Sequence, residues 1–415
     1  MFDSTDTSPS LPGDRLRSIR LSRGLTQEGL AERAGLSLAV VKKLERGGNA
    51  RLETLHSLAQ ALRVRTSALL EPVGPHATTR DDRDKVDLMP LRQVISPPMT
   101  VSGRLLVADT ADIEPDLRQL RSTASALATS YYSDDYEALA RLLPALVRSA
   151  RLAVTHFDNG PQHTEALRLR SDILQMVGRY LTQVRAYDLA HIALRESVTD
   201  SVTAADRTGA ASAVYLQGWT MIRQGRLDET EALAIATADE IEPRISRASR
   251  SELGVWGRLL VRASSAAARN NRPSEAREML RLARTAGAAL GGGTAAHPYG
   301  WGRFDWSTVA LQAVENHVVA RRPDRVLGLA ARIASSATTM TSNTRWRHHL
   351  DVAQAHTQLG HGRQAVEVLA HLHGQAPEWL RHQQMAATIF QSALRSTGRR
   401  LSRRQRDLAA HFGVA

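Results

Sequence analysis

Two adjacent lysines, Lys42 and Lys43, stand out because almost every other basic residue of the chain is an arginine. They lie in the stretch LSLAVVKKLERGG (residues 36–48), and Lys85 is the single further lysine of the sequence. A lysine ammonium group is a compact, strongly hydrated charge that pairs with oxyanions such as phosphate and is rarely buried. Two such groups side by side make this stretch a candidate surface for binding a polyanion.

The spacing around the lysines predicts an amphipathic helix. Residues three or four apart share one face of a helix, so Val41 and Leu44 point to a core, with Val40 at its edge. Ser37 is a good N-cap, and Gly47 supplies the stop. The opposite face carries Leu38, Ala39, Lys42, Lys43 and Arg46. Taken alone, this face also fits the ordinary solvent-exposed side of a small helix.

Further helices are predicted on both sides of this one. Residues 14–24 form a first helix that Gly24 stops, and residues 26–35 form a second, with Thr26 as N-cap and Gly35 as its left-handed end. A closing helix follows over residues 51–64, in which four leucines face inward: Leu52, Leu55, Leu58 and Leu62. Only a few residues separate the second helix from the lysine-bearing one, and such a short connection suits a helix-turn-helix.

This block resembles the Xre/Cro family of helix-turn-helix DNA-binding domains of phage repressors and many bacterial regulators. The resemblance rests on residues at the family spacing: Thr26, Gln27, Leu30, Ala31, Gly35, Val41, Leu44, Glu45, Gly47, Leu55 and Leu58. It implies a five-helix domain whose third helix enters the major groove of double-stranded DNA.

The resemblance also implies roles for single residues. Gln27 would bind a DNA phosphate at the N-terminus of the second helix, and Arg20 with Glu45 would form an internal ion pair. The lysines would reach a guanine edge or a phosphate, and Leu38 or Ala39 a thymine methyl group. The expected DNA-facing residues are Thr26, Gln27, Ser37, Leu38, Ala39, Lys42, Lys43, Arg46, Asn49 and Arg51.

The composition narrows the classes of function. The formal net charge of +12 and an isoelectric point near 10.7 favour a polyanionic partner, although an arginine-rich chain is also what a GC-rich genome encodes. The absence of cysteine excludes disulfides, thiolate metal sites and a catalytic thiol. No stretch approaches the roughly 18 apolar residues of a membrane span, and the start MFDSTDTSPSLPGD lacks the apolar core of a signal peptide. We therefore expect a cytoplasmic protein without membrane contact.

Four segments are predicted along the chain. Residues 1–12 form a disordered leader, residues 13–72 the helix-turn-helix domain, residues 73–111 a linker rich in turn formers and charge, and residues 112–415 a body of helical repeats. Ala, Leu and Arg dominate the composition, and aromatic residues make up only 4%. These side chains lose little freedom in helices, so an all-α protein is expected.

The body is predicted to consist of helix pairs. Polar breaks recur about every 40 to 50 residues, within the range of helical-repeat arrays: YYSDD, LTQVRAY, RQGRLDE, RNNRPSE, ARRPDR and LGHGRQA. The clearest copies resemble tetratricopeptide repeats, with Gly225 and Gly362 at the break and Ala276 and Ala365 at the small packing position of the second helix. The resemblance implies an α-solenoid with a concave binding surface. The whole layout is similar to peptide-sensing quorum regulators and, more closely, to a large group of actinobacterial regulators.

Five of the six tryptophans lie on or near the first helices of these pairs, which tend to line the inner surface of such arrays. A pocket for a peptide or an aromatic small molecule is expected from Trp219, Trp256, Trp301, Trp306, Asn316, Arg345 and Arg347. The alternative is that the tryptophans fill the seams between repeats. The many late histidines show no HExxH or cysteine-containing pattern, and no constellation of residues supports catalysis, so we expect no metal, no cofactor and no enzyme.

Taken together, the sequence predicts a DNA-binding transcriptional regulator that places two helix-turn-helix domains of a homodimer on a palindromic operator. Its body would sense a peptide or small-molecule signal, mediate dimerisation, or both. The competing hypothesis is a protein-interaction scaffold of the tetratricopeptide type with a minor DNA-binding role.

Overall fold

Helices dominate the structure, a computed structural model that describes residues 12–48, 50–69, 88–102, 105–106, 114–297, 302–334, 342–396 and 403–413. Within these ranges there is no strand; isolated bridges join Met99 to Leu105 and Ala295 to Phe304. The prediction of an all-α chain is confirmed. None of the helices in the described ranges is long and apolar enough to cross a membrane. The predicted leader lies, apart from Pro12, outside the described residues.

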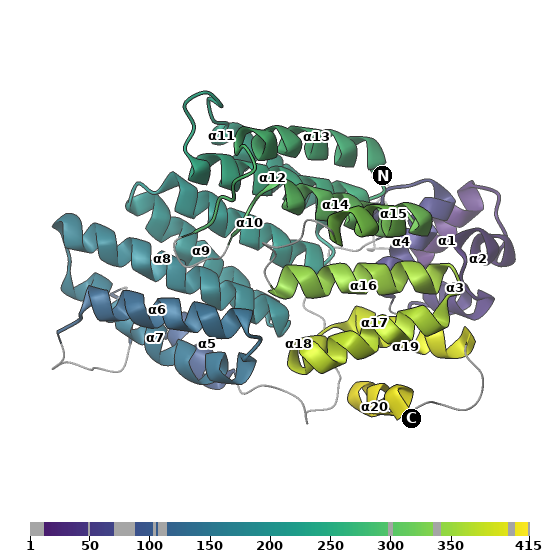
Figure 1. The fold of residues 1–415 in the computed structure, drawn as a ribbon, viewed down its shortest axis with the longest axis horizontal. Helices are drawn as coiled ribbons and strands as arrows, with labels where there is room; N and C mark the ends of the chain where they lie inside the picture. Colours follow the sequence, from purple (N-terminus) through teal and green to yellow (C-terminus); the bar gives the residue numbers. More distant parts are fainter. Residues whose placement is uncertain are drawn as a thin grey trace, which may run out of the picture.

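The N-terminal helices form a small bundle, the head, at one end of the molecule (Figure 1). Its elements are α1 Pro12–Ser22, α2 Gln27–Ala34, α3 Leu38–Glu45, α4 Leu52–Leu62 and the 3-10 helix η1 Thr66–Leu69. The fifth of the five predicted helices is thus a single 3-10 turn. Leu30, Val41 and Leu58 are completely buried at the centre of this bundle. Each comes from a different helix, so the core fixes the relative orientation of α2, α3 and α4.

The remaining helices, the body, stack as antiparallel pairs followed by a terminal cap (Figure 1). The first part comprises α5 Met89–Ile95, α6 Leu117–Tyr132, α7 Tyr136–His156, α8 Gly160–Gln183, α9 Tyr187–Thr203, α10 Arg207–Arg223 and α11 Leu227–Glu240. The second part comprises α12 Arg250–Arg269, α13 Pro273–Ala289, α14 Trp306–Val319, α15 Pro323–Ala334, α16 Ser342–Gln358 and α17 Gly362–Gln375. The cap comprises α18 Pro377–Arg381, α19 Gln384–Ser396 and α20 Arg403–Phe412.

Each helix pair from α6–α7 to α16–α17 reverses at one residue in the left-handed conformation. These residues, with φ between 53° and 81°, are Asp134, Arg185, Gly225, Asn271, Arg321 and Gly360. A left-handed residue after a helix lets the next N–H groups bond back to the last carbonyls, which ends the helix and turns the chain. All of them lie in the polar breaks predicted from the sequence. In the last pair, however, the turning residue is Gly360, whereas Gly362 begins α17.

The body curls until its first and last helix pairs touch. One continuous hydrophobic core joins α5–α9 to α16–α20. Across this contact, Trp346 Nε1 donates a hydrogen bond of 3.1 Å to Asp134 Oδ2, and the rings of Tyr136 and His382 meet edge to face at 5.6 Å. Helices α6, α8, α10 and α12 contribute residues to the hollow side of the curve. A concave surface, as expected of a helical-repeat solenoid, therefore exists.

A short helix lies within the segment predicted to be a linker. Leu91, Val94 and Ile95 of α5 are buried in the core of the body. Arg151 on α7 donates a hydrogen bond of 2.9 Å from Nε to the backbone carbonyl of Val94. Residues 89–95 therefore pack as part of the body, because their apolar side chains find a place beside α7 and α9. Residues 73–87, 103–104 and 107–111 of the predicted linker lie outside the described residues.

Candidate nucleic-acid interface

Helix α3 presents the predicted basic face to solvent. Val41 and Leu44 are buried in the head, whereas Ala39 and Lys43 on the opposite side are exposed and Lys42 is half-buried. Within the described part of the chain, no carboxylate lies within ion-pair distance of either lysine. Arg46, exposed just after the helix, extends the same positive surface. Leu38 is half-buried, so the apolar start of α3 is only partly accessible.

The connection between α2 and α3 consists of three residues with a fixed geometry. Gly35 is left-handed, with φ of 63°, and its N–H and that of Leu36 bond back to the last turn of α2. Ser37 occupies the N-cap position of α3 with extended backbone, but its exposed hydroxyl group makes no capping hydrogen bond. The short turn sets the angle between the two helices, as a helix-turn-helix requires.

A buried ion pair joins α1 to the end of α3. The guanidinium of Arg20 contacts both carboxylate oxygens of Glu45, at 2.5 Å from Nε and 3.0 Å from Nη2. Both side chains are less than one-tenth exposed. The hydrogen bond to Glu45 raises the pKa of Arg20. Burial alone would raise the pKa of Glu45, but the hydrogen bonds from Arg20 and Gln27 have a larger combined effect. The pKa of Glu45 is therefore lowered. The structural role expected for this pair is therefore seen in its geometry.

Gln27 belongs to the same network. Its Nε2 donates a hydrogen bond of 2.6 Å to Glu45 Oε2, so in this structure the amide points to the ion pair. Thr26 caps α2 by accepting a bond of 3.0 Å from the N–H of Gly29. The first N–H groups of a helix have no partner within it and point outward, where they favour an anion. The N-terminus of α2 can therefore receive a phosphate through its backbone, with Gln27 held close by.

The loop after α3 meets the body. Arg51 is exposed, and its guanidinium donates a hydrogen bond to the Thr388 hydroxyl on α19. To contact a DNA phosphate as predicted, the Arg51 side chain would have to break this hydrogen bond. Asn49, the other residue expected there, lies outside the described residues.

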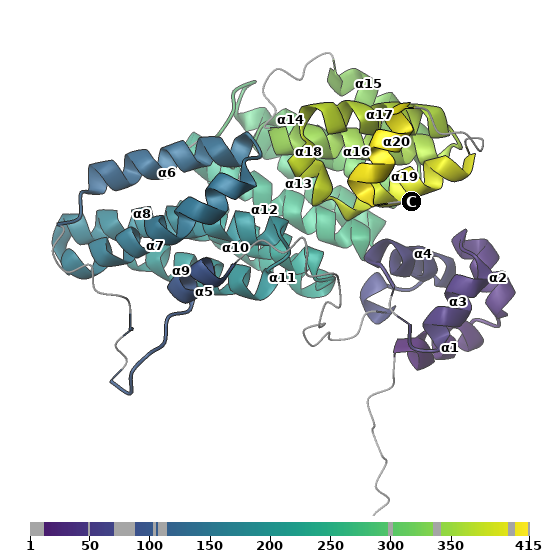
Figure 2. The same ribbon diagram turned by 90° about the horizontal axis from the view of Figure 1, so that it is seen from below.

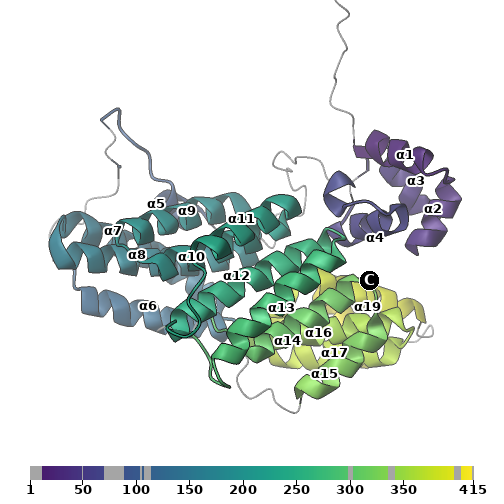
Figure 3. The same ribbon diagram turned by 90° about the horizontal axis from the view of Figure 1, so that it is seen from above.

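The head docks on the body through α4 and η1, which leaves the exposed face of α3 uncovered (Figures 2 and 3). The docking site is the row of turns at one edge of the solenoid. Leu52, predicted to face the head core, packs instead against body residues on α10, α11 and α12. The Asn270 side chain accepts from the N–H of Ser67 at 2.9 Å, and Asn271 donates to the Val64 carbonyl at 3.1 Å. Arg321 donates to the Ala34 carbonyl at 3.0 Å.

His56 lies in the middle of this docking surface and is 7% exposed. Its Nδ1 is 2.7 Å from the carbonyl oxygen of Arg269, and its Nε2 is 3.2 Å from that of Val319. Burial lowers the pKa of the imidazole, as do the charges of Arg269 and Arg321, and the two carbonyls offset only part of this effect. The docked head therefore holds His56 preferentially as the neutral ring.

We expect head docking to weaken as the pH falls below the ordinary histidine pKa of about 6.5. Above it, His56 is neutral in both states; below it, the undocked state takes up a proton that the docked state disfavours, so the docked state loses stability. Amides of α4 and η1 should have lower protection factors against hydrogen exchange at pH 5.5 than at pH 7.5. Because other histidines titrate in the same range, His56→Gln is the control, and a pH response identical in this variant would contradict the assignment.

The structure does not gather the residues predicted to bind a ligand. Trp219 is half-buried on α10, Trp256 is 6% exposed within α12, and Trp306 is 47% exposed at the start of α14. Asn316 bonds to Ser264 and Gln312, Arg347 pairs with Glu315 and Asp351, and Arg345 is exposed near the Trp346 ring. Trp301 lies outside the described residues. None of the described six lines the cavity found on the hollow side of the body.

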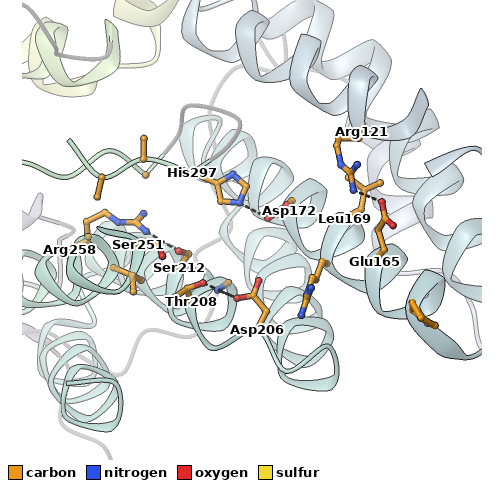
Figure 4. A pocket seen from close by; sticks show the side chains of 18 residues that line it. Arg121, Glu165, Leu169, Asp172, Asp206, Thr208, Ser212, Ser251, Arg258 and His297 are labelled. Atoms are coloured by element: carbon orange, nitrogen blue, oxygen red, sulfur yellow. Dashed lines mark hydrogen bonds and ion pairs between the residues drawn. The ribbon is translucent and has the colours of Figure 1, made fainter. Parts of the chain in front are cut away.

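This cavity has a volume of about 790 Å³. Its walls come from α6, α8, α10, α12 and the segment around Ala295 (Figure 4). Ser212 and Arg258 lie on one side, and Asp172 with His297 on another. Arg258 was not predicted as a site residue, although an arginine amid the apolar and small residues of LGVWGRLLVRASSAAA is a signal for a functional side chain. No group of three or more His, Asp or Glu side chains suited to a metal occurs in the described ranges.

The head matches a known family. Residues 16–69 match the family model described as Helix-turn-helix. Comparison of the chain with curated proteins and with solved structures gives no match. The matched range contains the buried ion pair, the left-handed turn and the exposed basic face of α3 described above. The head is thus a helix-turn-helix domain, and it supports the assignment of the chain as a DNA-binding transcriptional regulator.

Proposed function

We propose that the protein is a sequence-specific transcriptional regulator whose α3 reads operator DNA. The single observation that carries this proposal is the exposed face of Lys42, Lys43 and Arg46 on a helix that the head core holds rigidly. These cations have the reach for guanine edges and phosphates in a major groove. Because the head packs against the body through α4 and η1, α3 can meet DNA while the two parts stay docked.

The body, from α5 to α20, is proposed to sense a peptide or small-molecule signal, to mediate dimerisation, or both. Two turns of the solenoid contact the head directly, one through Asn270 and Asn271 and the other through Arg321. A change in the spacing of these turns would therefore move the head or release it. A dimer is expected because α3 of one head has only eight residues, which would give modest affinity for DNA. Two linked heads that bind the same duplex together would increase the overall affinity. We place the protein in the cytoplasm, where its DNA would be.

Selection from a random library of double-stranded oligonucleotides tests this function. The full chain should enrich a palindrome whose half-sites are about 10 base pairs apart, or a multiple of one helical turn. Its affinity for the enriched duplex should fall steeply with salt concentration, because phosphate contacts release counterions. Sedimentation of the complex gives the number of chains per duplex. Failure to enrich any sequence, or binding that is insensitive to salt, would contradict the proposal.

A further inference from the structure

We propose that the cavity of the body binds a small organic anion whose carboxylate or phosphate group pairs with Arg258. This inference deepens the sensing role proposed above and rests on it, since it names the chemical class of the signal. The cavity volume of about 790 Å³ lies within the range of small-molecule sites in proteins. Its walls come from four helices that belong to consecutive pairs of the solenoid, so an occupant would bridge them.

Arg258 is a buried cation without a counter-charge. Its side chain projects from α12 toward Ser212 on α10, and Nη2 donates a hydrogen bond of 2.8 Å to the Ser212 hydroxyl (Figure 4). The residue is only 6% exposed, yet Nε and Nη1 have no hydrogen-bond partner. Burial lowers the pKa of Arg258 to about 10, so the group stays charged at neutral pH. A buried, unpaired charge is costly, and a guanidinium cannot escape that cost by losing its proton.

Two more arginines increase the positive charge behind Arg258. Arg262, one turn further along α12, lies over the ring of Tyr215 with Cζ 4.3 Å from the ring centroid, and its Nε has no hydrogen-bond partner. Arg179 on α8 also has two partnerless nitrogen atoms, Nε and Nη2. The charges of both act on Arg258 and further lower its pKa. Among the described carboxylates, none lies within ion-pair distance of these three arginines. The Tyr215 ring compensates only in part.

The acidic groups of the cavity are already engaged, which points to an anionic rather than a cationic ligand. Asp172 pairs with His297 at 3.0 Å, and Glu165 pairs with Arg121. Asp206 caps α10 by accepting from the N–H of Gly209 at 2.9 Å. Among the charged groups of the cavity wall, Arg258 is therefore the one that most clearly lacks hydrogen-bond acceptors and a counter-charge. Guanidinium groups match carboxylate and phosphate oxygens in charge and geometry.

Thermal unfolding of the full chain with matched probes tests the inference. Succinate, its neutral analogue succinamide and inorganic phosphate are compared at equal ionic strength set with sodium chloride. Succinate or phosphate should raise Tm by roughly 2–4 °C or more, the shift expected when binding stabilises a domain of this size by about 1 kcal/mol. A response to succinate alone identifies a carboxylate ligand, and a response to phosphate alone identifies a phosphate ligand. No shift beyond that of sodium chloride for either anion would overturn the inference.

Two variants locate the site. Arg258→Gln should abolish the shift, whereas Arg277→Gln, which removes an exposed arginine from α13, should keep it. A shift that survives in Arg258→Gln would overturn the assignment. If Arg258→Gln does not fold, hydrogen exchange of the wild type decides: succinate, but not succinamide, should protect peptides of α8, α10 and α12, and protection elsewhere alone would contradict the site. DNA affinity of Arg258→Gln without added anion should stay within about twofold of wild type, so the two proposals fail independently.

Discussion

Arg20→Ala is expected to reduce the free energy of unfolding of the head by about 3 kcal/mol. The variant leaves the Glu45 carboxylate buried with only Gln27 as a partner, and an uncompensated buried charge is more costly than the pair is favourable. The Leu25 carbonyl, which accepts a bond of 2.7 Å from Arg20, loses its partner as well. Hydrogen exchange of amides in residues 16–62 measures the effect in the full chain.

Two controls separate the ion pair from a general loss of positive charge. Arg33→Ala removes an exposed arginine from α2 and should change head stability by less than about 0.5 kcal/mol. Arg20→Met combined with Glu45→Met should recover most of the stability, because apolar side chains of similar size remove both charges together. If Arg20→Ala proves as mild as Arg33→Ala, the pair is not what holds α1 to α3.

The ion pair also makes the stability of the head depend on pH in the acid range. Because the pKa of Glu45 is lowered in the folded state, its contribution is fully present above the unfolded carboxyl value of about 4.3 and is lost as the pH falls through the lowered folded pKa. This acid loss is distinct from the one attributed to His56, which begins near pH 6.5 and concerns docking rather than head folding. Variants at Glu45 and at His56 should therefore change different parts of the pH profile.

The sequence was most informative where structure depends on neighbouring residues. Thr26, Gly35 and Gly47 fix the ends of short helices through local backbone geometry, and all three act as predicted. The six polar breaks likewise coincide with the left-handed turns of the solenoid. In each case, the deciding interaction spans fewer than about five residues. A resemblance in this short region could therefore be recognised without any knowledge of the rest of the chain.

Features that depend on distant parts of the chain were not predictable in the same way. Leu52 fits the inward pattern of α4, but it packs on the body because α4 is buried on two sides. His56 gave no signal, since the carbonyls of Arg269 and Val319 that surround it are more than 200 residues away. The cavity arises from four helices whose order in space the periodicity does not give. The described tryptophans do not line it: Trp256, for example, is 6% exposed and packs in a hydrophobic core of the body.

Lys42→Ala combined with Lys43→Ala should weaken binding to the selected operator by about 10- to 100-fold. Each lysine that contacts a phosphate or a base edge contributes about 1 kcal/mol or more, and neither ammonium has a described partner inside the protein that would be left unpaired by the change. Head folding should be unaffected, since the core side of α3 consists of Val41 and Leu44. Fluorescence anisotropy with the enriched duplex measures the loss.

The control removes the same charge elsewhere. Arg277 and Arg281 are exposed on α13, and replacing both by alanine should change the affinity by less than about twofold at physiological salt, where the Debye length is about 8 Å. An equal loss in the two double variants would show that only net charge matters and would contradict a recognition role for α3.

The single lysine variants then decide what each side chain contacts. Removing a lysine that contacts a phosphate should reduce the slope of log K against log salt concentration by about 0.9. It should also weaken binding to all DNA sequences alike. A lysine bound to a guanine should instead relax the preference at one base pair, by about 1–3 kcal/mol. Since Lys42 is half-buried and Lys43 is exposed, we expect Lys42 to be the more ordered and the base-reading residue, and Lys43 to contact the DNA backbone. The apolar neighbours Leu38 and Ala39 offer only methyl contacts, so loss of Lys42 should remove most of the discrimination that α3 provides.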